Sequence, residues 1–213
     1  MSTLFLVPGL GADCRIYKHI DLSGHEVVNI SWLEPEKHDT LSTYAQKLID
    51  NYRITPQSIV IGNSLGGMLA IEIAKRVTLD KVILISSIKS IDEAPWYFSF
   101  FKTTQLHRLV PTKKLTSLEF GIEYAFGGMS ESDQKLFADM LKSTSPHFME
   151  WAIGAILNWD NQTIPKNVYH IVGDNDRVFP YQKIKGATVV KGGTHTMIFN
   201  NAKRISNWLK EIL

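Results

Sequence analysis

The sequence predicts an α/β fold: a mostly parallel six-stranded sheet with helices on both faces and one helical insertion. Six short β-branched runs alternate with helical patterns, and several of these runs are apolar at successive positions, as in strands covered on both faces. The alternation stops between about residues 90 and 166, where the pattern is helical. Strand–helix alternation is typical of a parallel sheet with right-handed crossovers.

The expected strands are short runs bounded by turn residues. They cover residues 3–7, 26–30, 58–61, 81–86, 167–172 and 187–190. Between the second and third runs, apolar side chains recur with helical spacing from Leu41 to Tyr52, and Thr40 is a candidate N-cap. The same spacing recurs from Ala202 to Leu213 and predicts a C-terminal helix.

The interruption defines the expected domain organisation: a core domain of residues 1–89 and 166–213, and a helical insertion of residues 90–165. Ser145 before Pro146 predicts one helix start, and Ser130 with Asp133 three residues later predicts another. The insertion holds 12 of the chain's 22 aromatic residues. It therefore either covers another part of the molecule or forms a helical subdomain with its own core.

Composition and charge narrow the function classes. The formal net charge of +2 is too small for a nucleic-acid-binding surface, and no dense run of Lys or Arg favours an anionic membrane. No apolar run is long enough to span a bilayer, and the first residues lack a signal-peptide pattern. Cys14 is the only cysteine, which excludes an intrachain disulfide. We therefore expect a cytoplasmic protein with a small-molecule partner and without nucleic-acid or membrane binding; the oligomeric state stays open.

One stretch places a serine between glycines where a strand is expected to become a helix. It reads GNSLG (residues 62–66) and lies between the run 58–61 and an apolar helical pattern. A serine that projects from so tight a turn has a strained backbone, and its neighbours two positions away must be small. The stretch lacks the Lys-Ser/Thr ending of a phosphate-binding loop. It is therefore either a glycine-softened turn or a turn that exposes Ser64 as a nucleophile.

A serine nucleophile needs a histidine base and an acid that orients the histidine. His195 lies just past the expected strand 187–190, and Asp174 and Asp176 follow the strand 167–172. Loops at the carboxyl ends of parallel strands form the active site of an open sheet. Spacing alone does not separate Asp174 from Asp176.

Three motifs in the order nucleophile, acid and base resemble those of the α/β-hydrolase superfamily, in particular its serine carboxylesterases: GNSLG, GDNDRVFP and GGTH. The resemblance covers essentially the whole chain but lacks the family's first two strands, which implies a reduced six-stranded core. The insertion lies where the family has its lid. The family's acid motif, GxxDxxxP, maps onto Gly173, Asp176 and Pro180 and so implies Asp176 as the acid.

The resemblance also implies an oxyanion hole. The loop after the first strand typically reads His-Gly-X in the family and reads PGLG (residues 8–11) here, with Pro8 in place of the histidine. The backbone N–H groups of Leu10 and Leu65 are then the expected donors to the substrate. The two glycines of PGLG also begin like a dinucleotide fingerprint, but Cys14 occupies the place of the third glycine. With strands numbered in chain order, a 2-1-3-4-5-6 order places both glycine-rich loops at the switch point.

Together, the residues and the resemblance imply a serine hydrolase in which Ser64 attacks an acyl carbonyl, His195 accepts the hydroxyl proton and Asp176 orients the imidazole. The expected substrate is a carboxylic ester with a small apolar acyl group, because the insertion is rich in aromatic and methionine side chains. No organic cofactor or metal is expected, since the sequence has no HExxH or CxxC motif. The alternatives are a thioesterase that uses the basic stretch 101–114, a carbon–carbon bond hydrolase, and a small-molecule sensor that retains the triad.

Overall fold

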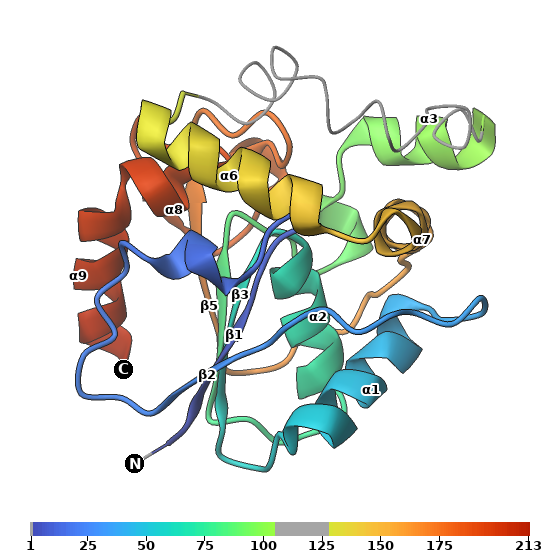
Figure 1. The fold of residues 1–213 in the computed structure, drawn as a ribbon, viewed down its shortest axis with the longest axis horizontal. Helices are drawn as coiled ribbons and strands as arrows, with labels where there is room; N and C mark the ends of the chain where they lie inside the picture. Colours follow the sequence, from blue (N-terminus) through green and yellow to red (C-terminus); the bar gives the residue numbers. More distant parts are fainter. Residues whose placement is uncertain (1, 105–127) are drawn as a thin grey trace.

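The computed structural model describes residues 2–104 and 128–213 and contains a six-stranded sheet in the order β2-β1-β3-β4-β5-β6 (Figure 1). All five strand pairs are parallel, so the predicted strand order is confirmed. The strands are β1 (Leu4–Val7), β2 (Val27–Asn29), β3 (Ile59–Asn63), β4 (Lys81–Ile85), β5 (Val168–Gly173) and β6 (Thr188–Val190). Each coincides with an expected run to within two residues at either end.

The burial of the strands depends on their place in the sheet. Every residue of β1 and β3 is buried, as expected for strands covered on both faces. The edge strand β2 has no buried residue, and β6 has one, Val190. The strands β1 and β3 in the sheet are therefore fully buried, whereas the edge strands β2 and β6 are partly exposed, because an edge strand has a neighbouring strand on one side only.

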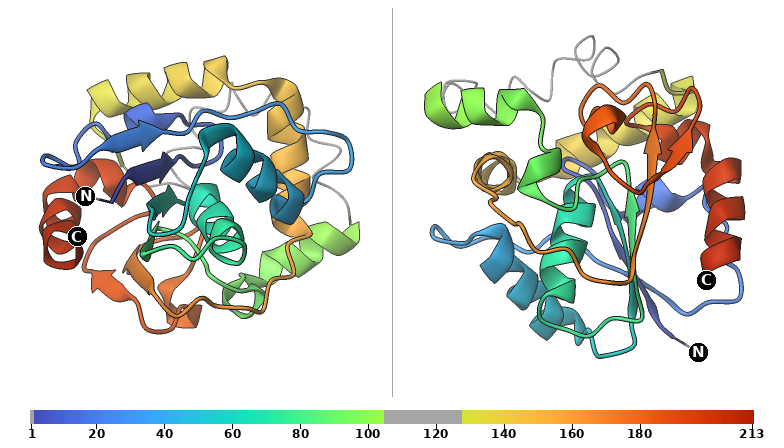
Figure 2. Two further views of the ribbon diagram at one scale, coloured as in Figure 1. Left: turned by 90° about the horizontal axis from the view of Figure 1, so that it is seen from below. Right: turned by 180° about the vertical axis from the view of Figure 1, so that it is seen from behind.

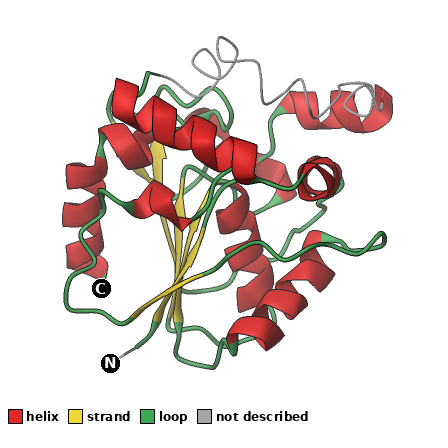
Figure 3. Cartoon of the chain, viewed as in Figure 1, coloured by secondary structure: helices red, strands yellow, loops and turns green. Residues whose placement is uncertain are grey.

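Two helical layers enclose the sheet, as Figures 2 and 3 show. Helices α1 (Leu41–Tyr52) and α2 (Leu65–Ala74) cover one face, and α8 (Met197–Asn200) and α9 (Ala202–Ile212) cover the other. The predicted start of α1 is confirmed, since the Thr40 side chain accepts a hydrogen bond from Thr43 N and the Thr43 side chain accepts one from Thr40 N. Short 3-10 segments lie at Cys14–Tyr17, Ile91–Glu93 and Tyr181–Lys183.

The described part of the insertion contains α3 (Trp96–Thr104), α6 (Glu131–Ser143) and α7 (Pro146–Leu157). Ser130 and Ser145 accept hydrogen bonds from Asp133 N and Phe148 N, so both predicted helix starts are confirmed. Figure 1 shows α6 lying across the end of the sheet opposite the N-terminus, which is the carboxyl end of the strands. The division into residues 1–89 with 166–213 and residues 90–165 stays a prediction.

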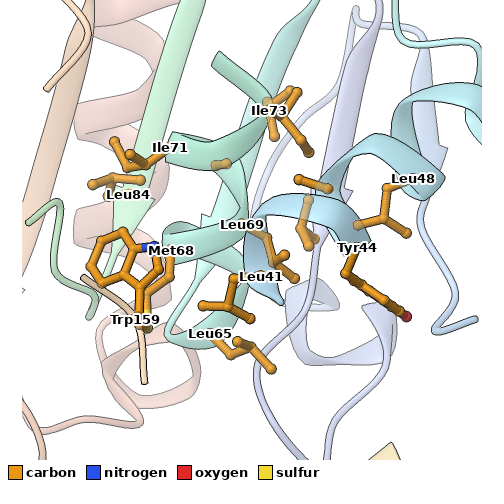
Figure 4. Close-up of a cluster of buried hydrophobic side chains, with 14 of the residues drawn as sticks. Leu41, Tyr44, Leu48, Leu65, Met68, Leu69, Ile71, Ile73, Leu84 and Trp159 are labelled. Carbon is orange, nitrogen blue, oxygen red and sulfur yellow. The ribbon is translucent and has the colours of Figure 1, made fainter. Parts of the chain in front are cut away.

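The described insertion helices share their core with the sheet. Phe148, Ala152 and Trp159 belong to one cluster with α1 and α2, whereas Phe137 and Met140 belong to the cluster on the opposite face. Figure 4 shows Trp159 beside Met68, and its indole N–H donates to Glu72 Oε1 at 2.9 Å. Of the two interpretations left open by the aromatic content, the structure therefore favours an insertion that covers another part of the molecule.

Among the described residues, no helix is long and apolar enough to cross a membrane. The basic stretch 101–114 lies outside them from residue 105 onwards.

Candidate active site

Ser64 forms the turn between β3 and α2. Its backbone has φ 53° and ψ −118°, a conformation that costs a non-glycine residue about 1–3 kcal/mol. Ser64 N donates to Ile85 O at 3.0 Å, which fixes the turn against the end of β4. The strand–turn–helix context predicted for Ser64 is therefore confirmed, and the strain is the kind of outlier found at functional sites.

The glycines around Ser64 leave room for backbone crossings. A Cβ on Gly62 would lie 2.2 Å from Gly66 O, and a Cβ on Gly66 would lie 2.2 Å from Val7 O. Both distances are too short for any side chain, so these two positions admit glycine alone. A Cβ on Gly67 would lie 2.4 Å from Ser87 Oγ, so the third glycine leaves room for a side chain that follows β4.

The structure brings Ser64, His195 and Asp176 into one hydrogen-bonded chain. Ser64 Oγ lies 2.9 Å from His195 Nε2, and His195 Nδ1 lies 2.9 Å from Asp176 Oδ2. A carboxylate only accepts hydrogen bonds, so the Nδ1 proton donates to Asp176 and leaves Nε2 free to accept from the serine hydroxyl. His195 and Asp176 are 4% and 5% exposed, respectively, whereas Ser64 is half-buried.

Asp176 is held in place by backbone donors. Its Oδ1 accepts from Val178 N and Phe179 N, both at 2.8 Å, while Oδ2 faces His195. Asp174, in the same loop, instead uses Oδ1 to accept from Gly192 N at 2.6 Å. Of the two carboxylates that spacing left open, Asp176 is therefore the one that faces His195.

The loop 8–11 after β1 packs directly against the serine turn. A Cβ on Gly9 would lie 3.3 Å from Ser64 Cβ and 3.1 Å from Asn63 Nδ2, so Asn63 is buried behind this loop. Leu10 is half-buried, and Leu65 is the first residue of α2, where the backbone N–H groups lack helical acceptors. Leu65 thus follows Ser64 in the chain, and Leu10 follows Gly9, which packs against Ser64.

Two side chains form hydrogen bonds with the residues on either side of this loop. The Tyr17 hydroxyl donates to Val7 O at 2.7 Å, directly before Pro8, and the Trp32 indole donates to Ala12 O at 2.8 Å. Trp32 in turn stacks on Phe148 of α7, with ring centroids 4.7 Å apart. Side-chain hydrogen bonds therefore fix the backbone on both sides of the loop 8–11.

Apolar side chains lie beside His195 and beside the loop 8–11. The Phe179 ring contacts the His195 ring edge-on at 5.5 Å, and a Cβ on Gly11 would lie 2.7 Å from Leu141 Cδ1 and 3.9 Å from Met149 Sδ. The aromatic and methionine side chains of the insertion differ in burial, and Met129 and Trp151 are half-buried. Buried are Phe98, Met140, Met149 and Trp159, whereas Trp96, Phe100 and Phe101 are exposed.

Sequence reasoning missed two polar residues near Ser64. The Ser87 hydroxyl donates to Ser64 O at 2.7 Å, and His170 Nε2 lies 3.0 Å from Ser87 O. His170 is buried in β5, where the sequence shows only a histidine within an apolar strand. The one available signal was the pair Ser86-Ser87 at the end of an otherwise apolar strand.

In the described ranges, no group of three or more His, Cys, Asp or Glu side chains could hold a metal ion. Cys14 lies away from the serine turn, with Sγ 3.3 Å from both Leu6 O and Ile30 O. Burial raises the pKa of this thiol to about 12, so it is unsuited to nucleophilic chemistry.

Solved structures of similar fold include several hydrolases. An esterase from Exiguobacterium antarcticum has a TM-score of 0.76 at 16% identity, covering 100% of this chain and 91% of that one. A thermophilic esterase from Thermogutta terrifontis has a TM-score of 0.73 at 15% identity, covering 99% and 89%. A bromoperoxidase from Bacillus anthracis has a TM-score of 0.72 at 17% identity, covering 98% and 90%. These likenesses show a shared fold.

No curated protein sequence matches the chain. A family model described as "Alpha/beta hydrolase family" matches residues 2–207, nearly the full length. The family model and the structures of similar fold agree, and the chain belongs to the alpha/beta hydrolase family.

Proposed function

We propose that this protein is a serine hydrolase that cleaves carboxylic esters of small, apolar acyl groups through an acyl-enzyme intermediate. The observation that carries the proposal is the continuous chain from Asp176 through His195 to Ser64, with both contacts at 2.9 Å, on a strained turn. A structural serine has no need of a strained backbone and a buried, oriented imidazole. The combination matches the requirements of an activated nucleophile.

In the proposed reaction, Ser64 Oγ attacks the ester carbonyl and its proton passes to His195 Nε2. Asp176 stabilises the resulting imidazolium through its contact with Nδ1. The N–H groups of Leu10 and Leu65 stabilise the negative carbonyl oxygen, and one such donor is typically worth about 3–4 kcal/mol. His195 then protonates the leaving alcohol, and water, activated by the same imidazole, releases the acid from Ser64.

The apolar surroundings favour an apolar acyl group. Leu141 and Met149 approach the loop that carries Leu10, and Phe179 lines the imidazole. A charged acyl group next to these side chains would lose its hydration without gaining a partner, which disfavours it. The expected small size of the acyl group is tested by the series of ester chain lengths below.

The test is multiple-turnover hydrolysis of p-nitrophenyl acetate, butyrate, octanoate and laurate, with Ser64→Ala as the control. We expect turnover that is highest for the short esters and absent in Ser64→Ala. A single slow turnover would instead identify a sensor that retains the triad. Faster hydrolysis of an acyl thioester than of the matched oxygen ester would identify a thioesterase, and cleavage of a carbon–carbon bond without ester turnover would identify a C–C hydrolase.

A further inference from the structure

Both backbone polar groups of Ser64 are hydrogen-bonded by the last residue of β4 and the segment that follows it. Ser64 N donates to Ile85 O at 3.0 Å, and Ser64 O accepts from the Ser87 hydroxyl at 2.7 Å. The same carbonyl also accepts from Gly67 N at 2.9 Å as part of the first turn of α2. The Ser87 hydrogen bond is therefore an additional constraint, which helix α2 does not need in order to form.

The residue before Ser87 is strained as well. Ser86 has φ 48°, is fully buried, and its hydroxyl has no hydrogen-bond partner among the described residues. In the described part of the chain, the other non-glycine residues with positive φ, besides Ser64, are Arg53 and Gln57, which lie in exposed turns. A buried left-handed serine persists only where its surroundings hold it there. Its effect is to turn the chain sharply between the end of β4 and Ser87.

The strand β5 and the helix α2 together hold Ser87 in this position. His170 Nε2, on β5, donates to Ser87 O at 3.0 Å. Burial and the nearby charge of Lys89 lower the pKa of His170 to about 3, so the ring is neutral near neutral pH. Gly67 leaves the space that the Ser87 side chain fills, since a Cβ there would lie 2.4 Å from Ser87 Oγ. β5 thus binds the backbone carbonyl of Ser87, and α2 leaves space for its hydroxyl.

We propose that Ser87 is a positioning residue for the nucleophile: its hydrogen bond to Ser64 O holds the strained turn in the conformation that directs the serine hydroxyl at His195. This inference rests on the proposed hydrolase function. Ser87 touches the backbone of Ser64 and not its Oγ, so the effect acts on geometry. Catalysis is sensitive to such geometry because small displacements of a nucleophile lower the rate steeply.

The test compares Ser87→Ala with Ser206→Ala. Ser206 is a matched control, since it is also a buried serine whose hydroxyl donates to a backbone carbonyl, Ala202 O at 2.8 Å, but it lies on α9. We expect Ser87→Ala to lower kcat about tenfold with KM nearly unchanged, and Ser206→Ala to leave both unchanged. The Ser206 hydroxyl also accepts from Asp21 N at 3.0 Å, so Ser206→Ala should lower the melting temperature at least as much as Ser87→Ala does while leaving kcat unchanged.

Ser87→Cys is the second variant and retains a weak donor of similar shape. We expect the loss of kcat in Ser87→Cys to be smaller than that in Ser87→Ala. If Ser87→Ala does not fold, Ser87→Cys alone should show a kcat below that of the wild type at unchanged KM. Wild-type kcat in Ser87→Ala, or in Ser87→Cys where that is the only folded variant, would overturn the inference. A kcat loss in Ser206→Ala equal to that in Ser87→Ala would do the same. Lack of turnover in the wild type would instead refute the proposed function.

Discussion

Replacing Asp176 with asparagine would reverse the hydrogen bonding of His195. In the wild type, Asp176 Oδ1 accepts from two backbone N–H groups, those of Val178 and Phe179. In Asp176→Asn the amide oxygen must take this position, because an amide N–H cannot face two donors. The amide nitrogen then faces His195 Nδ1, which must become an acceptor. The ring proton moves to Nε2, and Nε2 can no longer accept the proton of Ser64.

The expected loss in kcat is about 10⁴-fold, which is roughly 5 kcal/mol of transition-state stabilisation. The fold should persist, since both backbone hydrogen bonds to Oδ1 are kept by the amide oxygen. Asp174→Asn is the matched control. Asp174 Oδ1 accepts from Gly192 N at 2.6 Å, and an amide oxygen can replace it, so activity should stay within about threefold of wild type.

The assay is the rate of p-nitrophenyl acetate hydrolysis, with circular dichroism and thermal melts to verify that both variants are folded. Activity in Asp176→Asn within about tenfold of wild type would refute the tautomer argument. A larger loss in Asp174→Asn than in Asp176→Asn would refute the choice of acid.

Three further predictions concern titratable groups away from Ser64 Oγ. Burial lowers the pKa of His170 from 6.5 to about 3, so between these pH values the unfolded chain binds a proton that the folded protein excludes. The free energy of unfolding, measured by urea melts, should therefore fall by up to ~1.4 kcal/mol for each unit by which the pH is lowered through this range. His170→Gln should flatten this slope. Burial opposes the ionisation of Asp133, but hydrogen bonds from Lys18, Ser130 and His19 lower its pKa from 3.8 to about 2. Asp133→Asn should therefore lower the melting temperature at neutral pH, and the difference from wild type should vanish as the pH falls towards about 2. Burial raises the pKa of Cys14 to about 12, so Ellman's reagent should react with its thiol only on unfolding; rapid reaction of the native protein would contradict this.

Much of the fold could be predicted because its signals are local. The capping side chains of Thr40, Ser130 and Ser145 lie within three residues of the backbone groups they bind, and each buried strand is a continuous apolar run. In the candidate site, such local signals exist for Ser64 and His195. Ser64 has its signal in the adjacent glycines, and His195 follows a strand whose carboxyl end must lie at the same edge as the serine turn.

The remainder depends on which segments meet in space. Asp174 and Asp176 share one loop, and only the direction of the backbone donors at Val178 and Phe179 determines which carboxylate faces the histidine. The contact of Ser87 with Ser64 arises because β4 pairs with β3. The packing of the insertion helices into the two core clusters likewise joins residues far apart in the chain, and no local pattern records it.

The central claim is that Ser64 is an activated nucleophile. It is tested most directly by treating the protein with a fluorophosphonate and locating the adduct by mass spectrometry. The account predicts a single adduct on the peptide that carries Ser64, formed much more slowly in Asp176→Asn and absent in Ser64→Ala. An unlabelled wild-type protein, or equal labelling of Ser64→Ala, would contradict it.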